Sequence, residues 1–253
     1  MSTVRVEDRE GGVRVLTLDR PPANAIAPDL LEDLASALHS AGSTDSVRAV
    51  VLTGNGRFFS AGLDLRQTTN AGDLAAVLLE RFRDTFVALL EFPKPTVAML
   101  NGHAIAGGVI LLLACDYRLA VRGDYKVGLN EVAIGASFPR VAFEIVRLRL
   151  TNQQANEVLL GANIYPAGEA VRLGFVDELL AEEEFEDTVL RRAAQLGTHP
   201  REAYEHTKSA LVAEALDRVK AETREEAQAT ASVWMTPESL EARLRQAQKL
   251  GKG

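Results

Sequence analysis

The chain has 253 residues, of which 47% are hydrophobic and 25% are charged, and this composition is typical of an ordinary soluble globular protein with a substantial core. Its formal net charge of −7 argues against nucleic acid or an anionic membrane as the main partner, although local cations could still hold a small anionic ligand. Because Cys115 is the single cysteine and the N-terminus has no apolar signal segment, we expect a cytoplasmic protein without an intrachain disulfide.

In the first half of the chain, strand patterns alternate with helix patterns. Residues 13–18 are rich in β-branched side chains and lie between Gly12 and Pro21, which predicts a strand. A helix is expected from Pro28, where leucines recur at helical spacing. The next expected elements are a strand at 47–53, an amphipathic helix at 73–91, a strand at 95–100, an apolar helix ending at Cys115 and a strand at 117–121. This alternation predicts an α/β fold with a mainly parallel sheet and crossover helices.

From about Val141 onward the pattern is almost wholly helical. Thr151 is expected to cap a helix at 152–160, and Pro166 to start another helix that Gly174 ends. We therefore expect an α/β core at 1–199, which includes the first C-terminal helices, followed by a helical region at 200–253. The longest apolar run is too short to cross a bilayer, which takes about 20 residues, so no membrane partner is expected.

Two glycine-containing segments carry the strongest chemical signal. The first is Phe59 to Leu65 (FSAGLDL), and the second is Asn101 to Gly108 (NGHAIAGG). Each can present a backbone N–H with no side chain in the way, and two convergent N–H groups form an oxyanion hole. A helix that begins near Gly107 adds free N–H groups and the positive end of its dipole. The alternatives are a simple tight turn for the first segment and close helix packing for the second.

A carboxylate follows the second segment at Glu131, in the sequence GLNE. A single carboxylate beside a polarised carbonyl suits the movement of a proton, although a loop carboxylate is by default a surface residue. Asp64 comes just after a turn and is expected to bond backbone N–H groups there. Together the segments predict proton-transfer chemistry on a thioester.

Other site chemistries have weaker support. The four histidines, at positions 39, 103, 199 and 206, have no metal-ligand spacing with one another or with Cys115, so no metal is expected. The dinucleotide spacing G-x-G-x-x-G is absent from the second glycine segment. Neither Ser60 nor Ser137 lies in a G-x-S-x-G elbow. His103 is interpreted as part of the fold, and Cys115 as a small buried hydrophobe.

The two glycine segments, Cys115-Asp116, the GLNE segment and the early residues 20–25 (RPPANA) together resemble the crotonase (enoyl-CoA hydratase/isomerase) superfamily. The resemblance extends from about Val13 to Leu180. It implies a repeated ββα core with a helical C-terminal region and an acyl-CoA thioester as substrate, without a separate cofactor. It also implies a homotrimer or a dimer of trimers, in which residues 200–253 help to form the trimer.

The resemblance also assigns roles to residues of this chain. The backbone N–H groups of Leu63 and Gly107 would form the oxyanion hole, and Glu131 would be the catalytic acid and base. Removal of one oxyanion donor typically costs roughly 3–4 kcal/mol of transition-state stabilisation. The residues expected to line the substrate site are Ala23, Ala25, Ala61, Gly62, Asp64 and Gly108.

Within this superfamily the chain looks most like the Δ3-Δ2-enoyl-CoA isomerases. Hydratases have two glutamates, and the position of the first is Ile110 here, whereas the second is Glu131. An apolar Ile110 cannot hold a water molecule, but one carboxylate is enough to move a proton between C2 and C4 of a 3-enoyl thioester. Two alternatives stay open: a hydratase with a displaced second acid such as Glu144, and an acyl-CoA-binding protein without catalysis.

Overall fold

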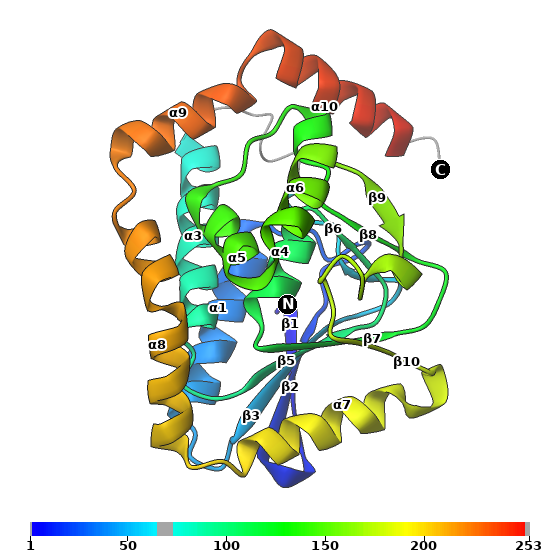
Figure 1. Ribbon diagram of the computed structural model, residues 1–253, viewed down its shortest axis with the longest axis vertical. Helices are drawn as coiled ribbons and strands as arrows, with labels where there is room; N and C mark the ends of the chain where they lie inside the picture. The colour runs from blue at the N-terminus through cyan, green and yellow to red at the C-terminus, as the bar shows by residue number, and fades with distance from the viewer. Residues whose placement is uncertain (1, 65–72, 251–253) are drawn as a thin grey trace.

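The computed structural model of the protein describes residues 2–64 and 73–250, with side chains at these positions except 73–76 and 246–250. The strands in these ranges form two sheets (Figure 1). The larger sheet has, in order, β1 (Val4–Arg9), β2 (Val13–Leu18), β3 (Ala49–Gly54), β5 (Thr96–Leu100), β7 (Tyr117–Val121) and β10 (Glu178–Leu180). Only the β1–β2 pair of this sheet is antiparallel, so the expected mainly parallel sheet is confirmed.

The smaller sheet is built from short strands that the sequence patterns did not predict. Its order is β4 (Phe58–Ser60), β6 (His103–Ile105), β8 (Lys126–Gly128) and β9 (Ile164–Pro166). Three times a strand of the larger sheet leads directly into a short strand of the smaller one, as β3–β4, β5–β6 and β7–β8. Helices α3 (Asp73–Leu90), α4 (Gly107–Ala114) and α5 (Arg140–Arg149) follow these pairs in turn. This is a repeated ββα core, and the expected fold class is confirmed.

The smaller sheet places the three motifs next to one another. Strands β4, β6 and β8 are parallel neighbours, and the carboxyl ends of parallel strands meet at one edge of a sheet. Gly62 comes just after β4, Gly107 just after β6 and Glu131 just after β8. The topology therefore gathers at one edge residues that lie far apart in the chain.

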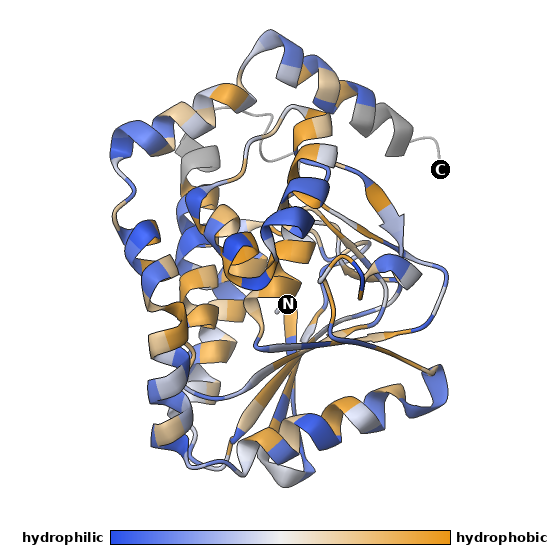
Figure 2. Cartoon of the chain, in the orientation of Figure 1, coloured by the Kyte–Doolittle hydropathy of each residue, from blue (hydrophilic) through white to orange (hydrophobic). Residues whose placement is uncertain are grey.

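The central strands of the larger sheet, β2, β3, β5 and β7, are largely buried on both faces, as expected where helices cover a parallel sheet on both sides. Val15, Val51 and Val97 face α7 (Glu182–Gly197), whose Phe185 and Val189 pack on them. The alternate residues of the same strands pack in the main core with α1 (Pro28–Ser43), α3 and α4. Figure 2 shows hydrophobic residues along the strands and on the helices that face them.

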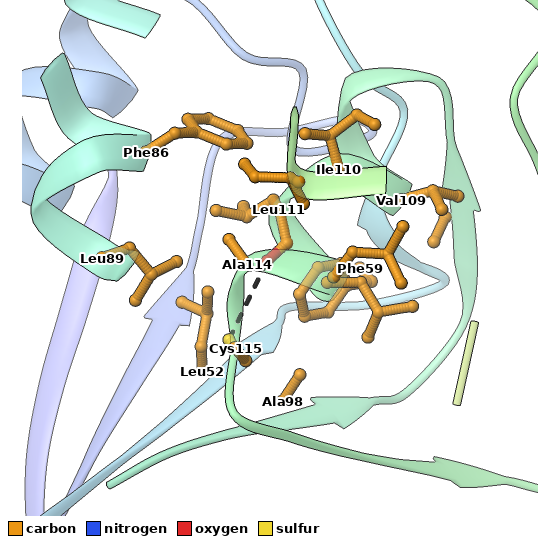
Figure 3. Packing of buried hydrophobic residues seen from close by; sticks show 14 of the residues in the cluster. Leu52, Phe59, Phe86, Leu89, Ala98, Val109, Ile110, Leu111, Ala114 and Cys115 are labelled. Carbon is orange, nitrogen blue, oxygen red and sulfur yellow. Dashed lines mark hydrogen bonds between the residues drawn. The ribbon is translucent and has the colours of Figure 1, made fainter. Parts of the chain in front are cut away.

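The helix after the second glycine segment lies at the centre of the main core. Every residue of α4 is buried, and Figure 3 shows Val109, Ile110 and Leu111 packed among Phe59, Phe86 and their neighbours. Cys115 is fully buried, and its Sγ lies 3.8 Å from the Leu111 carbonyl oxygen. Burial raises the pKa of its thiol to about 12. The interpretation of Cys115 as a buried hydrophobe is confirmed.

The second half of the chain is only partly as expected. The Thr151 cap is confirmed, since its side chain accepts the Gln154 N–H at the start of α6 (Asn152–Gly161). The helix expected from Pro166 to Gly174 is wrong, because Pro166 ends β9 and only a 3-10 turn, η3 (Ala167–Glu169), follows. The Ala167 N–H donates to the Tyr125 carbonyl oxygen at 2.9 Å, which ties this segment to the residue just before β8 (Lys126–Gly128). Strands β9 and β10 also interrupt a region expected to be helical.

The last helices are α8 (Arg201–Lys220), α9 (Arg224–Trp234) and α10 (Pro237–Leu250). Helix α8 packs on α5 and is tied to the core by Lys208 and Tyr204, which bond Asp116 at 2.8 and 3.1 Å. Helices α9 and α10 form an arch across one end of the molecule (Figure 1). The boundary at residue 199 stays a prediction. No helix in the described ranges is long and apolar enough to cross a membrane.

Candidate active site

In the first glycine segment, the Leu63 N–H points away from the neighbouring Ile26 segment of the same chain. Ile26 and Leu63 form a parallel bridge, in which the Ile26 N–H donates to the Gly62 carbonyl oxygen at 2.8 Å and the Asp64 N–H to the Ile26 carbonyl oxygen at 2.9 Å. Both bonds use the residues beside Leu63. The Leu63 N–H itself has no acceptor among the residues that the structure describes, so it is available to a ligand oxygen.

The second glycine segment presents a free N–H at Gly107, the first residue of α4. The preceding Ala106 has φ 53° and ψ −127°, a conformation that non-glycine residues rarely adopt and that is often found at functional sites. Its own N–H donates to the Gly128 carbonyl oxygen at 2.8 Å, which ties the segment to β8. The Gly107 N–H has no intrahelical partner and no other acceptor within the described ranges.

Gly62 and Gly107 are in close contact. Gly62 has φ +80°, and a Cβ at this position would lie 2.9 Å from the Gly107 nitrogen and 2.7 Å from the Ile105 carbonyl oxygen. Only glycine fits such an approach without a shift of the backbone. The structure thus brings together the two segments that were expected to form the oxyanion hole, and it also supplies the reason for glycine at position 62.

Gly108 has a packing role. A Cβ there would lie 2.2 Å from the Ser60 carbonyl oxygen, so its absence lets α4 approach β4. Close packing, the alternative considered for this glycine pair, therefore explains the glycine at position 108. The packing around Gly107 is less tight, because the atom nearest to an added Cβ would be 3.3 Å away. Contact of Gly108 with substrate stays a prediction.

The segment with Ala23 and Ala25 is held beside the first glycine segment by Asn24, a residue that was not among the expected site residues. The buried Asn24 side chain donates to the Phe58 carbonyl oxygen at 2.7 Å and to that of Asn55 at 3.1 Å. The Ala61 N–H donates to the Ala23 carbonyl oxygen at 3.0 Å. Asparagine tolerates the observed φ of 50° better than most residues. Its residue type was the only feature of the sequence that could have pointed to this role of Asn24.

Asp64 connects the same two segments through its charge. Its Oδ2 lies 3.2 Å from Arg20 Nη1, and only 6% of Asp64 is exposed. Arg20 also pairs with the exposed Asp29 at 3.1 Å. This contact supports the structural role expected for Asp64, which shapes the segment that carries Ala61, Gly62 and Leu63. Leu65, the last residue of the motif, lies outside the described residues.

Glu131 begins the turn after β8 and is the N-cap of the 3-10 helix η2 (Val132–Ile134). Its backbone carbonyl oxygen accepts the N–H groups of Ile134 and Ala136 at 3.1 and 2.8 Å. Glu131 is 8% exposed, and its Oε2 has no hydrogen-bond partner in the described part of the chain. Burial therefore raises the pKa of the carboxyl to about 8. A carboxyl with this pKa can both accept and return a proton near neutral pH.

Glu144, considered as a displaced second acid, is wrong for that role. It is fully buried on α5, and its Oε2 accepts a hydrogen bond from Arg218 Nε at 2.6 Å. Arg147 and Arg140 lie 3.7 and 4.0 Å from its other oxygen. This carboxylate neutralises an arginine cluster between α5 and α8. Ile110 is buried in the main core, so the position of a hydratase's first glutamate holds no acid.

The remaining candidates have structural partners. The Ser60 hydroxyl donates to the Asn24 carbonyl oxygen at 2.7 Å, and that of Ser137 to the Thr230 carbonyl oxygen at 2.8 Å. His103 Nδ1 accepts the Lys126 N–H at 3.1 Å, and its ring packs on Phe58, as expected for part of the fold. No group of three histidine, cysteine or acidic residues suited to a metal occurs among the described residues.

Trp234, at the end of α9, is a further residue of the site region. It packs with Ile134 and Ala136 of the turn after Glu131, and Leu63 lies against the same apolar cluster. Its one signal in the sequence was a lone tryptophan in a polar tail. Nothing in the sequence placed it beside two motifs that lie far earlier in the chain.

Comparisons with known proteins identify the family of the chain. A sequence model of the enoyl-CoA hydratase/isomerase family matches residues 8–248. A probable enoyl-CoA hydratase of Bacillus subtilis strain 168 is 39% identical over 125 residues, which span 49% of this chain and 48% of that relative. The peroxisomal enoyl-CoA delta isomerase 2 of Arabidopsis thaliana is 33% identical over 198 residues, which span 75% of this chain and 82% of the relative.

Among solved structures, human mitochondrial Δ3-Δ2-enoyl-CoA isomerase matches with a TM-score of 0.94 and 26% sequence identity, over 99% of this chain and 98% of that chain. The chain belongs to the enoyl-CoA hydratase/isomerase family, which acts on acyl-CoA substrates. The superfamily resemblance seen in the sequence is confirmed. The relatives carry both the hydratase and the isomerase name.

Proposed function

We propose that the protein is an enoyl-CoA isomerase, which moves the double bond of a 3-enoyl-CoA from C3 to C2. The observation that carries the proposal is that Glu131, just after β8, is a buried carboxyl with a raised pKa, while Ile110 occupies the position of a second acid. The pairing of Glu144 with Arg218 removes the other acid that we considered. The structural match to a human isomerase supports the same assignment.

In the proposed reaction the thioester oxygen accepts hydrogen bonds from the Leu63 and Gly107 N–H groups. The Glu131 carboxylate removes a proton from C2, and the electron pair forms a dienolate whose negative oxygen these N–H groups stabilise. The protonated Glu131 then returns the proton to C4, which leaves the double bond between C2 and C3. One carboxyl is first base and then acid, so no water, metal or further cofactor enters the balance.

The second candidate is an enoyl-CoA hydratase, which the name of the Bacillus relative favours. Addition of water to C3 needs a group that holds and activates the water molecule, and two carboxylates serve this purpose better than one. An acyl-CoA-binding protein without catalysis is the third candidate. Glu131 argues against it, since a binder has no need of a buried carboxyl whose charge is costly.

One assay separates the three candidates. The purified protein is incubated with a 3-enoyl-CoA and, separately, with crotonyl-CoA, and the conjugated thioester is followed by its ultraviolet absorbance. An isomerase increases this absorbance with the first substrate and changes it little with the second. Hydration of crotonyl-CoA at a rate equal to or above isomerisation would overturn the proposal in favour of a hydratase. Binding without either change would indicate the third candidate.

A further inference from the structure

A small apolar cluster, separate from the main core, lies beside the candidate active site. It consists of the buried residues Ile134, Ala136 and Trp234, with Leu63 and Leu79 packed against them. Leu63 carries one proposed oxyanion N–H, whereas Ile134 and Ala136 belong to the turn that Glu131 begins. The cluster therefore adjoins both the polarising and the proton-transferring parts of the site.

Among the described residues of this cluster, Trp234 alone comes from the C-terminal tail, and several contacts hold it in place. Its indole N–H donates to the Ser137 carbonyl oxygen at 2.9 Å and approaches the Ser137 hydroxyl at 3.1 Å. The Ser137 hydroxyl donates in turn to the Thr230 carbonyl oxygen of α9 at 2.8 Å. A tryptophan N–H that is satisfied in this way leaves the rest of the ring as a rigid apolar surface.

Helix α10 fixes the same arrangement from its other side. The buried Arg243 donates to the Trp234 carbonyl oxygen, and its guanidinium lies 5.9 Å from the Trp234 ring centre. Ser239 packs on Gly135, where an added Cβ would lie 2.5 Å from the Ser239 Cα. The tail thus binds the turn after Glu131 of its own chain (Figure 1), and the position of Trp234 is defined by α9, α10 and this turn together.

The proposed substrate carries an acyl chain that this apolar cluster could bind. With the thioester oxygen at Leu63 and C2 and C4 near Glu131, the remaining acyl carbons must continue beyond the reacting atoms. Leu63 and Leu79 are only half-buried, so apolar surface stays open beside the site. A hydrocarbon chain that covers such surface is stabilised by its removal from water.

We propose that Trp234 is a specificity-determining residue, which forms the distal wall of the acyl-chain site and limits the chain length accepted. The inference rests on the proposed acyl-CoA substrate. It assigns the charged tail a part in the site of its own subunit, in addition to the part in assembly that the family resemblance implies.

The first test uses Trp234 itself as the probe, because it is the only tryptophan in the chain. Free CoA and saturated butanoyl-, octanoyl- and dodecanoyl-CoA, which cannot isomerise, are titrated into the full-length protein while tryptophan emission is recorded. Calorimetry measures binding of each compound in parallel. We expect no change in emission with CoA, a small change with butanoyl-CoA and a larger one with the longer chains.

The outcomes separate this inference from the proposed function. Binding of all the acyl-CoAs with the same emission would overturn the role of Trp234 and leave the acyl-CoA assignment intact. Calorimetry that detects no binding of any acyl-CoA would overturn both. Since the ligands are not turned over, the result does not depend on isomerase or hydratase activity.

The second test compares substrate preference among variants. Trp234→Ala should raise the kcat/KM of a long-chain 3-enoyl-CoA relative to a short-chain one by about tenfold, because a hydrophobic pocket discriminates by this order for small changes in chain size. Trp234→Phe, which keeps an aromatic wall, should stay near the wild type. Val233→Ala, at the exposed neighbouring position, is the matched control for folding. An equal loss for all chain lengths in Trp234→Ala and Trp234→Phe would contradict the inference.

Discussion

Glu144 of α5 accepts a hydrogen bond from Arg218 of α8 at 2.6 Å, and this pair decides what Glu144 can do. Its side chain is fully buried, and a charge-assisted hydrogen bond to a guanidinium occupies the carboxylate oxygen, so this oxygen is not free to contact a substrate. Arg218 also bonds Glu214 on its solvent side. Glu144 therefore joins α8 to the core, and Glu131 stays the candidate for proton transfer.

The pair predicts a difference between two otherwise similar substitutions. Glu144→Gln should lower the melting temperature clearly, because it leaves Arg218 facing a buried neutral amide. Glu214→Gln, which removes the exposed partner of the same arginine, should change it little. Thermal unfolding of the two variants, measured side by side, checks this. Equal melting temperatures would show that the buried pair has no special weight.

Substitution of Glu131 by Gln should lower isomerase turnover by about 10²–10⁴-fold, the usual contribution of general acid–base catalysis. Acyl-CoA affinity should be kept, because the N–H groups of Leu63 and Gly107 are main-chain groups. Turnover is measured by absorbance of the conjugated thioester, and affinity by calorimetry with a saturated acyl-CoA. Turnover near that of the wild type would show that another group moves the proton.

The raised pKa of Glu131 predicts the pH dependence of the reaction. Glu131 must be ionised to remove the C2 proton, and burial raises its pKa to about 8. We expect kcat/KM to rise tenfold per pH unit below this value and to reach a plateau above it. A profile measured from pH 6 to 9.5 would show this rise. A plateau that already begins near pH 5 would contradict a buried, protonated Glu131 in the free protein.

The same shift predicts how Glu131 affects stability. Its pKa rises from 4.5 to about 8 on folding, so the folded chain holds a proton that the unfolded chain has lost between these values. Stability therefore falls as pH rises across this window, by at most about 5 kcal/mol, and the penalty is absent below pH 4.5. Glu131→Gln should thus be more stable than the wild type at pH 8.5 and similar at pH 4.5. Denaturant unfolding at both pH values measures the difference, and an equal effect at both would refute this account.

Deletion of the residues after Lys220 should lower the oligomer mass and weaken acyl-CoA binding together. The expectation combines the assembly role that the resemblance implies with the contacts of α9 and α10 on the turn after Glu131. Light scattering gives the mass and calorimetry gives the affinity. Weaker binding at unchanged mass would restrict the tail to its own subunit, and no change in either would give the tail some other role.

The sequence alone determined the elements that local patterns specify. Residues 13–18 and 117–121 form strands with the expected bounds, and the helix from Pro28 has its predicted apolar face, because side-chain periodicity reflects which face a segment buries. The glycine segments and Glu131 were identified from a different feature of the sequence, namely the type and the order of their residues. The sequence shows a glycine at position 62, but it does not show the close approach of Ile105 and Gly107 that leaves no room for a side chain there.

Only the tertiary structure decided which distant residues meet. Strands β4, β6 and β8 have three residues each, too few for a periodic pattern, and they exist because each pairs with the next. The same holds for the bond between Trp234 and Ser137, which are 97 positions apart, and for the pairing of Glu144 with Arg218. Burial also decides the pKa of Glu131, and burial is a property of everything packed around a residue, which its neighbours in the sequence do not specify.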